Sequence, residues 1–319
     1  MSHARLPRFQ RVAGVARIEL TARDREILRQ VRRHRFLRSY QIVDLLGGSR
    51  QHVLRRLQRL YHHGYLERPR AQIDYFRRGG SRAIAYGLGN KGAAWLKRDL
   101  DLPPQRLDWS ARNREAGRLF LEHALLTSEI MVSLELACRR RGGVRLLADD
   151  ELTLRKEVRG QREPFKWSVK LADGAKVGLI PDRVFALEFA GQGGAPVRAY
   201  YFLEADRSTM PVVRPNLSRT SFLRKLLAYE ATWSQGLHRS RWGFHRFRVL
   251  TVTSRPGRVK SLVEACRGLA RGQGLFLFTD AEALRASKDP LVLVWQTART
   301  DHPESLLDSL SPVHPPLVR

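Results

Sequence analysis

Three acidic residues and a lysine have the types and the spacing needed for phosphodiester chemistry: Asp182, Glu204, Asp206 and Lys225. Asp182 directly follows Pro181, whereas Glu204 and Asp206 end an apolar run and share one face of a strand, because strand side chains alternate with a period of two. Carboxylates at neighbouring strand ends are oxygen ligands of the kind that Mg²⁺ or Mn²⁺ prefers. Such an ion, with the Lys225 ammonium close by, could activate water for phosphodiester hydrolysis. The pattern predicts a metal site at the three acids.

A structural role for the same acids is the alternative interpretation. Two like charges on one face of a strand repel each other unless a cation neutralises them. That cation could be a metal ion, or it could belong to a salt-bridge network in which Asp206 pairs with Arg207 or Lys225. Both interpretations are compatible with the spacing alone.

Two further catalytic candidates of a second tier lie on the long helix predicted over residues 111–141. Glu129 could face a metal, although it shares an arc with other polar residues that suits solvent exposure. His123 lies among apolar residues, as core histidines do. Tyr229 could in principle act as a nucleophile, but its helical spacing from Leu226 is typical of a core aromatic residue.

Residues 18–105 carry the pattern of a winged helix. Thr21 begins a first helix as its N-cap, a second covers Tyr40–Leu46, and a third begins after Ser49 and ends near His63. The runs 65–68 and 83–88 then predict the two strands of a hairpin. Three helices followed by a hairpin make a winged helix-turn-helix domain.

Residues 106–300 predict a second domain of mixed helices and strands, so the fold class is α/β in the broad sense (α+β). Strands are predicted near 144–148, 152–158, 165–171, 177–189, 198–205, 247–253, 275–278 and 291–295. Helices are predicted at 218–233, 257–270 and 281–286. Residues 1–17 are predicted to form a flexible basic arm, and residues 301–319 a Pro-rich tail.

The third helix of the winged helix is predicted to bind DNA. Its polar face carries the DNA-binding candidates Arg50, Gln51, Arg55, Arg56 and Arg59, and the predicted wing carries Arg77, Arg78 and Arg82. A helix of this kind fits the major groove, where arginine reads guanine and glutamine reads adenine, while wing arginines grip the flanking backbone. A solvated basic face used for protein contacts is the alternative.

The charge balance of the whole chain also favours nucleic acid. The 319 residues include 58 lysines and arginines against 31 acidic residues, a formal charge of +27. The first 100 residues hold 23 basic and 7 acidic residues, or +16, which leaves +11 for the remaining 219. So large a surplus implies a polyanionic partner. We expect double-stranded DNA, because no apolar run of about 20 residues predicts a membrane span. Two isolated cysteines and the lack of a signal peptide predict a cytoplasmic protein.

Over roughly residues 20–280, the chain resembles the replication-relaxation family of plasmid and conjugative-element proteins. The resemblance lies in Ile180–Asp182, Phe202–Thr209, Lys225–Tyr229, the strand Val249–Thr253 and the winged helix. The family is similar in its C-terminal half to PD-(D/E)xK restriction-endonuclease-like nucleases, which implies such a mixed-sheet domain here. By position, Asp182 and Glu204 match the two acids of that motif. Its lysine falls on Asp206, a departure that Lys225 could compensate from the next helix.

The resemblance implies a protein that binds an origin-type site and nicks DNA by metal-dependent hydrolysis, since some members are mobilisation relaxases and others serve plasmid replication. A homodimer and other mobilisation or replication proteins are compatible partners. The alternative is a non-catalytic winged-helix regulator of replication or transcription with a degenerate nuclease domain. The Asp206 substitution is the feature that separates the two. RNA or general nucleic-acid binding through the basic surface alone is a third interpretation, which predicts loss of affinity with salt at any sequence and no site preference.

Overall fold

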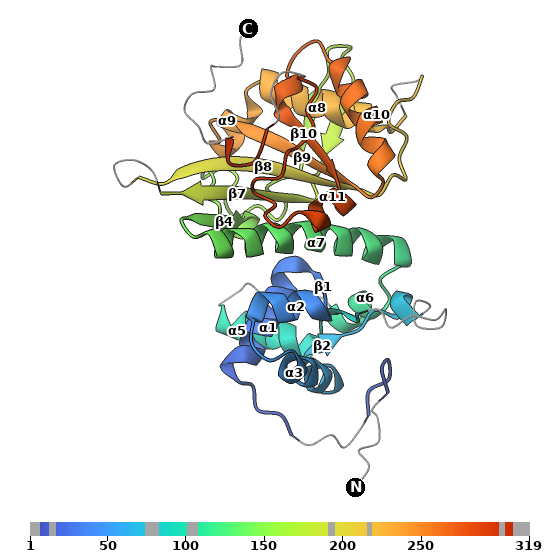
Figure 1. The fold of residues 1–319 in the computed structure, drawn as a ribbon, viewed down its shortest axis with the longest axis vertical. Helices are drawn as coiled ribbons and strands as arrows, with labels where there is room; N and C mark the ends of the chain where they lie inside the picture. The colour runs from blue at the N-terminus through green and yellow to red at the C-terminus, as the bar shows by residue number, and fades with distance from the viewer. Residues whose placement is uncertain are drawn as a thin grey trace. The chain divides into compact units, whose positions relative to one another are not determined.

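The computed structural model describes residues 7–12, 17–73, 83–100, 108–190, 195–215, 219–299 and 304–308. It divides into two compact units, Met1–Val132 and Ser133–Arg319, and the long helix α7 (Arg118–Arg141) begins in the first and ends in the second. Within those ranges no helix is both long enough and apolar enough to cross a membrane. Figure 1 labels the elements of both units.

The N-terminal unit has the predicted winged-helix plan. Its helices and strands are α1 (Ala22–His34), β1 (Phe36–Arg38), α2 (Ser39–Leu46), α3 (Arg50–His62), β2 (Leu66–Glu67), β3 (Ala85–Leu88), α5 (Asn90–Asp99) and α6 (Trp109–Arg114). The strands form an antiparallel sheet in the order β1-β3-β2, with Leu66 opposite Leu88. The predicted hairpin strands are therefore confirmed. The additional strand β1 was not predicted.

Local signals set the ends of the two helices that matter most. The Thr21 hydroxyl accepts a hydrogen bond from the Asp24 amide, and the Asp24 carboxylate accepts one from the Thr21 amide in return, a reciprocal cap that starts α1. Ser49 caps α3 by accepting from the His52 amide. Gly64 has a φ of +82°, which favours glycine and turns the chain out of α3 towards β2. The predicted start of both helices follows from these caps.

Two residues of the predicted flexible arm, Arg11 and Val12, form hydrogen bonds with the C-terminal end of α3. The Arg11 Nε atom donates to the Tyr61 carbonyl at 3.0 Å, and its Nη2 atom donates to the Glu67 carboxylate at 2.7 Å. The Val12 amide donates to His62 Nδ1 at 3.3 Å. These bonds hold the chain beside the C-terminal end of α3.

The C-terminal unit is built on a five-stranded mixed sheet in the order β10-β9-β8-β7-β4. Its strands are β4 (Val144–Ala148), β7 (Arg183–Phe189), β8 (Val197–Asp206), β9 (Phe247–Thr253) and β10 (Phe276–Asp280). Strands β8, β9 and β10 are parallel to one another, whereas β7 is antiparallel to both of its neighbours, β4 and β8. This mixed sheet with its helices confirms the predicted α+β class.

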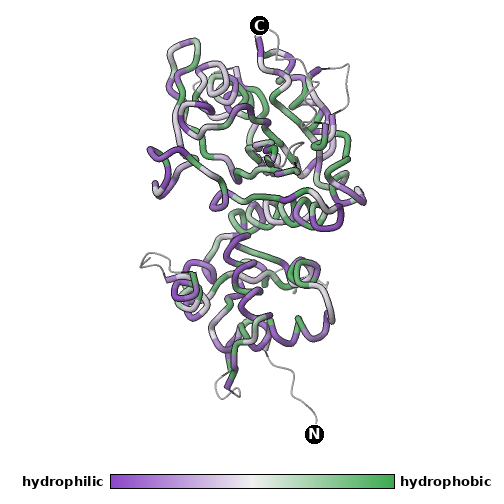
Figure 2. Tube along the Cα trace, turned by 90° about the vertical axis from the view of Figure 1, so that its left-hand side faces the viewer, coloured by the Kyte–Doolittle hydropathy of each residue, from purple (hydrophilic) through white to green (hydrophobic). Residues whose placement is uncertain are grey.

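One face of the sheet is buried under helices and a small hairpin. These elements are α8 (Phe222–Ser234), α9 (Leu237–Trp242), α10 (Pro256–Arg267) and the strands β5 (Trp167–Lys170) and β6 (Lys176–Leu179); α11 (Ala281–Ala286) follows β10. Phe202 of β8 lies at the centre of this core, in contact with the rings of Trp167 and Tyr229. Figure 2 shows hydrophobic residues concentrated inside this unit and hydrophilic ones along its loops.

Four predicted elements differ from the structure. The helix predicted over residues 111–141 is interrupted at 115–117, between α6 (Trp109–Arg114) and α7 (Arg118–Arg141). Residues 152–158 do not form a strand, because their backbone folds into turns, with the Val158 and Arg159 amides both donating to the Arg155 carbonyl. The strand predicted over 177–189 is divided into β6 and β7 on either side of Pro181, which has no amide hydrogen for a ladder. Residues 291–295 make only an isolated bridge, between Trp295 and Glu304.

Candidate functional site

The acidic site lies where β7 begins and β8 ends. Leu203 pairs with Arg183 in the antiparallel ladder, so the residue before β7 lies beside the last residues of β8. The Asp182 amide donates to the Leu203 carbonyl at 3.0 Å, and the Ala205 amide donates to Asp182 Oδ2 at 2.7 Å. Asp182 is thereby held against the strand segment that carries Glu204. The ladder thus brings these two segments together at one end of the inner strands β7 and β8.

Glu204 is enclosed by two donors from α8. Its side chain is 2% exposed, and its two oxygens accept from Lys225 Nζ at 2.6 Å and from the Tyr229 hydroxyl at 2.7 Å. Lys225 and Tyr229 are one helical turn apart and therefore reach the same carboxylate. Tyr229 is buried, as a core aromatic residue would be, but its hydroxyl makes a specific polar contact that the helical spacing alone did not indicate.

The charges of this cluster influence one another. Burial raises the pKa of the Glu204 carboxyl above its usual value, and the Lys225 ammonium opposes that shift. Burial alone would lower the pKa of Lys225, but the Glu204 carboxylate, helped by Asp182 and Asp206, raises it. Burial and the Glu204 charge also raise the pKa of Tyr229. Lys225 thus bonds directly to Glu204, and the charges of Asp182 and Asp206 also act on it.

Asp206 has a partner that the sequence did not indicate. Arg258, in the first turn of α10, donates through Nη2 to Asp206 Oδ1 at 3.1 Å and through Nε to Oδ2. The same guanidinium donates to the Met210 carbonyl at 2.5 Å. Asp206 is 8% exposed, so this two-pronged ion pair is largely buried. The predicted structural alternative named Arg207 or Lys225 as partners of Asp206; it did not include Arg258, and Lys225 bonds directly to Glu204.

Glu204 and Asp206 are already bonded to side-chain donors in this structure. Both oxygens of Glu204 and both of Asp206 already accept from cationic or hydroxyl donors. In the part of the chain that the structure describes, no three acidic, histidine or cysteine side chains could together hold a metal ion. An ion would have to displace Lys225 or Arg258 from a carboxylate. The assignment of Mg²⁺ or Mn²⁺ to Asp182, Glu204 and Asp206 stays a prediction.

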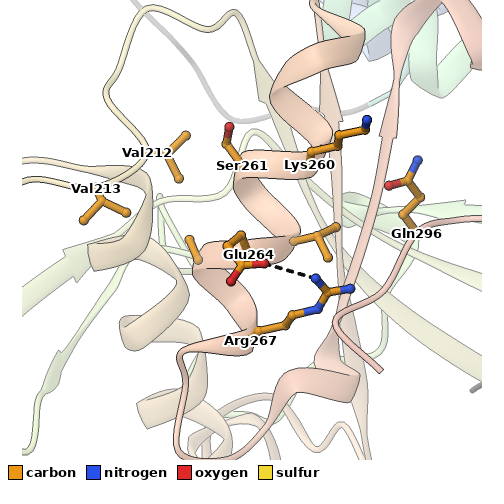
Figure 3. A pocket seen from close by; sticks show the side chains of 9 residues that line it. Val212, Val213, Lys260, Ser261, Glu264, Arg267 and Gln296 are labelled. Carbon is orange, nitrogen blue, oxygen red and sulfur yellow. Dashed lines mark hydrogen bonds and ion pairs between the residues drawn. The ribbon is translucent and has the colours of Figure 1, made fainter. Parts of the chain in front are cut away.

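A separate hollow lies beside α10. It has a volume of about 820 Å³ and is lined by Val212, Val213, Lys260, Gln296 and neighbouring residues. Figure 3 shows Glu264 and Arg267 paired across one side of it, at 3.0 Å. None of the four predicted catalytic side chains lines this hollow. Its size therefore says nothing about the chemistry of the acidic edge.

The candidate DNA-binding residues divide into three groups. Arg50, Gln51 and Arg55 are exposed on α3. Arg56 instead forms a buried ion pair with Asp24, and Arg59 Nη2 donates to the Arg17 carbonyl at 3.2 Å. The wing residues lie outside the described residues: Arg77, Arg78 and Arg82. Arg56 is thus engaged in holding α3 to α1.

The second-tier candidates lie on α7 in the N-terminal unit. His123 and Glu129 are both half-buried, and the Thr127 hydroxyl donates to the His123 carbonyl at 3.0 Å. Their catalytic assignment stays a prediction.

The fold and its site define a class: a winged-helix protein with a mixed-sheet α+β unit whose acids gather at one sheet edge. The family model for replication-relaxation matches residues 28–246, and the chain belongs to this family. Membership indicates a replication-related or relaxase-related role. No curated protein and no solved structure matches the chain.

Proposed function

We propose that the protein binds double-stranded DNA at an origin-type site of a plasmid or conjugative element, with α3 as its reading helix. The observation that carries this proposal is the exposed face of α3, where Arg50, Gln51 and Arg55 project from a helix capped at Ser49. Arginine forms two hydrogen bonds with a guanine edge, and glutamine does so with adenine. Family membership and the formal charge of +27 support the same partner.

Arg55→Ala is expected to weaken binding by about 1–3 kcal/mol, or roughly 5- to 150-fold, if this side chain reads a base. The duplex would be selected from a random library by the unmodified protein, and affinity would be measured by fluorescence anisotropy at one fixed salt concentration. Arg98→Ala on α5 removes an exposed arginine outside the α3 face and serves as the matched control. Equal losses in both variants, or none in either, would contradict base reading by Arg55.

Metal-dependent nicking is the second candidate function. The contact between Lys225 and Glu204, beside Asp182, supports it, because a nuclease of the PD-(D/E)xK type needs a cation next to its acids. The Arg258 ion pair on Asp206 favours the alternative, a non-catalytic replication or transcription regulator. Both candidate functions include DNA binding by α3, so the proposal for α3 does not depend on whether the protein nicks DNA.

A nicking assay separates the two. Supercoiled plasmid carrying the selected site is incubated with protein and Mg²⁺ or Mn²⁺, and open circles are counted on a gel. A nickase would produce open circles, and Asp182→Asn would slow their formation by more than about 100-fold. Asp173→Asn, in the exposed turn between β5 and β6, is the control and should cut at the parental rate. If no open circles form, or if Asp182→Asn cuts like the parent protein, the nickase assignment fails.

A further inference from the structure

A second basic surface lies on the C-terminal unit, away from the acidic edge. It consists of five exposed cations, which we call the basic loop surface: Arg155, Lys156, Arg159, Arg162 and Arg239. The first four come from the turns over residues 152–162, where a strand was predicted, and the fifth comes from α9. None of them forms an ion pair with a carboxylate of the described residues, and Glu157 is the single acid among them in sequence.

Tertiary contacts bring these two segments together. Arg155 packs against Gly243, which directly follows α9. A Cβ atom added to Gly243 would lie 3.7 Å from Arg155 Cγ. The Arg241 guanidinium donates to Gln161 Oε1 at 3.3 Å and to the Lys166 carbonyl at 3.2 Å, and Trp242 Nε1 donates to the Pro164 carbonyl at 3.0 Å. Two segments about 80 residues apart in sequence thus form one rigidly supported surface.

The basic loop surface and the acidic site occupy opposite ends of the sheet. Phe247, the first residue of β9 after α9, pairs with Tyr200, whereas Thr251 pairs with Glu204. Four residues of strand separate these two positions, or about 13 Å. Anything bound on the basic loop surface is therefore a contact separate from the chemistry at Glu204.

The composition of the surface identifies its partner. Phosphate oxygens are recognised by arginine forks and lysine charges without any apolar anchor. In the described ranges, no large exposed hydrophobic side chain lies within residues 152–166 or 235–246. Protein interfaces rely on buried aromatic or aliphatic anchors, and membrane-surface segments insert apolar side chains. Five cations without an ion pair to a carboxylate of the described residues, and without such an anchor, favour a phosphate backbone over an acidic protein or a lipid surface.

We infer that the basic loop surface is a second DNA-binding site, which holds the phosphate backbone of double-stranded DNA without reading its sequence. This inference rests on the proposed function, because it extends the contact that α3 makes. Each phosphate contact releases counterions, so the surface adds affinity that falls steeply with salt.

The test compares two triple variants of the full-length protein on a 60-base-pair duplex that contains the selected site. Arg155→Gln/Arg159→Gln/Arg162→Gln removes three charges from the surface, and Arg98→Gln/Lys260→Gln/Lys288→Gln removes three exposed charges elsewhere. Three lost phosphate contacts should reduce the slope of log affinity against log salt by about 2 to 3. The control slope should stay close to that of the parent protein, and site preference should be unchanged in both.

A parental slope in the surface variant would overturn the inference while leaving the α3 proposal intact. Conversely, Arg50→Ala/Arg55→Ala tests α3 alone: if this variant binds like the parent protein while the surface variant loses affinity, the α3 proposal fails and the inference stands. Vesicles containing phosphatidylserine, single-stranded RNA and an acidic peptide provide the remaining arms. Binding that depends on Arg155, Arg159 and Arg162 for one of these ligands but not for the duplex would also overturn the inference.

Discussion

Glu204→Ala is expected to lower the free energy of unfolding of the C-terminal unit by about 3–5 kcal/mol. The substitution removes a carboxylate that is 2% exposed and leaves Lys225, itself only 29% exposed, without its counter-charge. It also leaves the hydroxyl of the buried Tyr229 without the acceptor it now has, which adds about 1–3 kcal/mol to the loss if nothing replaces it. Lys225 reaches water in part, so the lower end of the range is the better expectation.

The loss can be measured as hydrogen exchange of peptides from β8 in increasing urea, which reports on this unit separately from the winged helix. Glu264→Ala is the matched control, since its ion pair with Arg267 involves a glutamate side chain that is 74% exposed. Exposed pairs of this kind contribute within about 1 kcal/mol. If Glu204→Ala is as stable as the control, the Lys225 and Tyr229 contacts do not hold the site together.

Glu204→Gln separates the structural from the catalytic role of this residue. The amide has nearly the shape of the carboxylate and keeps one oxygen that can accept from Tyr229 or Lys225. We expect most of the stability to return in this variant. If the unit also nicks DNA, the neutral amide would still abolish activity. If the parent protein nicks DNA and Glu204→Gln regains stability but does not nick, Glu204 is catalytic. If the parent protein does not nick DNA, recovery of stability in Glu204→Gln indicates that Glu204 has a structural role alone.

Asp24→Ala is expected to destabilise the N-terminal unit by about 3–5 kcal/mol. Asp24 is fully buried and accepts from Arg56 Nε at 2.8 Å, from the Thr21 amide at 2.8 Å and from the Thr21 hydroxyl at 2.7 Å. The substitution therefore breaks a buried ion pair and the cap of α1 at once. The loss of the cap alone costs about 1 kcal/mol. Hydrogen exchange of peptides from α1 and α3 measures the effect.

Asp99→Ala is the control for this substitution, because Asp99 pairs with Arg29 at 2.6 Å on the exposed surface. Its effect should stay below about 1 kcal/mol. A loss in Asp24→Ala no larger than in Asp99→Ala would show that the Arg56 contact contributes little. Arg56→Ala should reproduce much of the Asp24→Ala loss. Its effect on DNA affinity would then follow the loss of folded protein, with no change in site preference.

The same pair makes stability depend on pH in a defined direction. Burial alone would raise the pKa of Asp24, but hydrogen bonds from Arg56 and Thr21 hold it below its ordinary value of 3.8. A carboxyl with a depressed pKa in the folded state contributes stability above the unfolded-state value and loses it as the pH falls towards the folded-state value. Acidification below about pH 4 should therefore destabilise the parent protein more than Asp24→Ala.

The Arg258 ion pair bears most directly on the relation between this chain and the nuclease motif. At the position proposed to correspond to the lysine of that motif, this chain has Asp206, and a guanidinium from α10 is bound to it. The end of β8 thus carries two acidic side chains, and in the folded protein Lys225 and Arg258 compensate their negative charges. Nicking would require these cations to remain beside the acids as catalytic groups or to be displaced by a metal ion. The plasmid assay decides between cutting and binding without cutting.

Elements whose signals are local could be predicted from the amino-acid sequence. Ser49 and Gly64 mark the start and the end of α3, and the 3.6-residue spacing buries Val53, Leu57 and Leu60. Alternation along β8 puts Glu204 and Asp206 on one face of the strand. The placement of Lys225 near the acids was also predictable, because α8 follows β8 and packs back on the same sheet. Each of these depends on neighbours within a few residues or on the next element of the chain.

The tertiary structure alone decided which cation pairs with which acid. Arg258 follows Asp206 by 52 residues and Arg56 follows Asp24 by 32, and no periodicity distinguishes these arginines from the many others in the chain. The turns over residues 152–162 also depend on contacts between distant segments. Their sequence pattern predicts a strand, but contacts with α9 override that preference. A basic chain offers each carboxylate many equivalent cations, and side-chain packing between distant segments selects one of them.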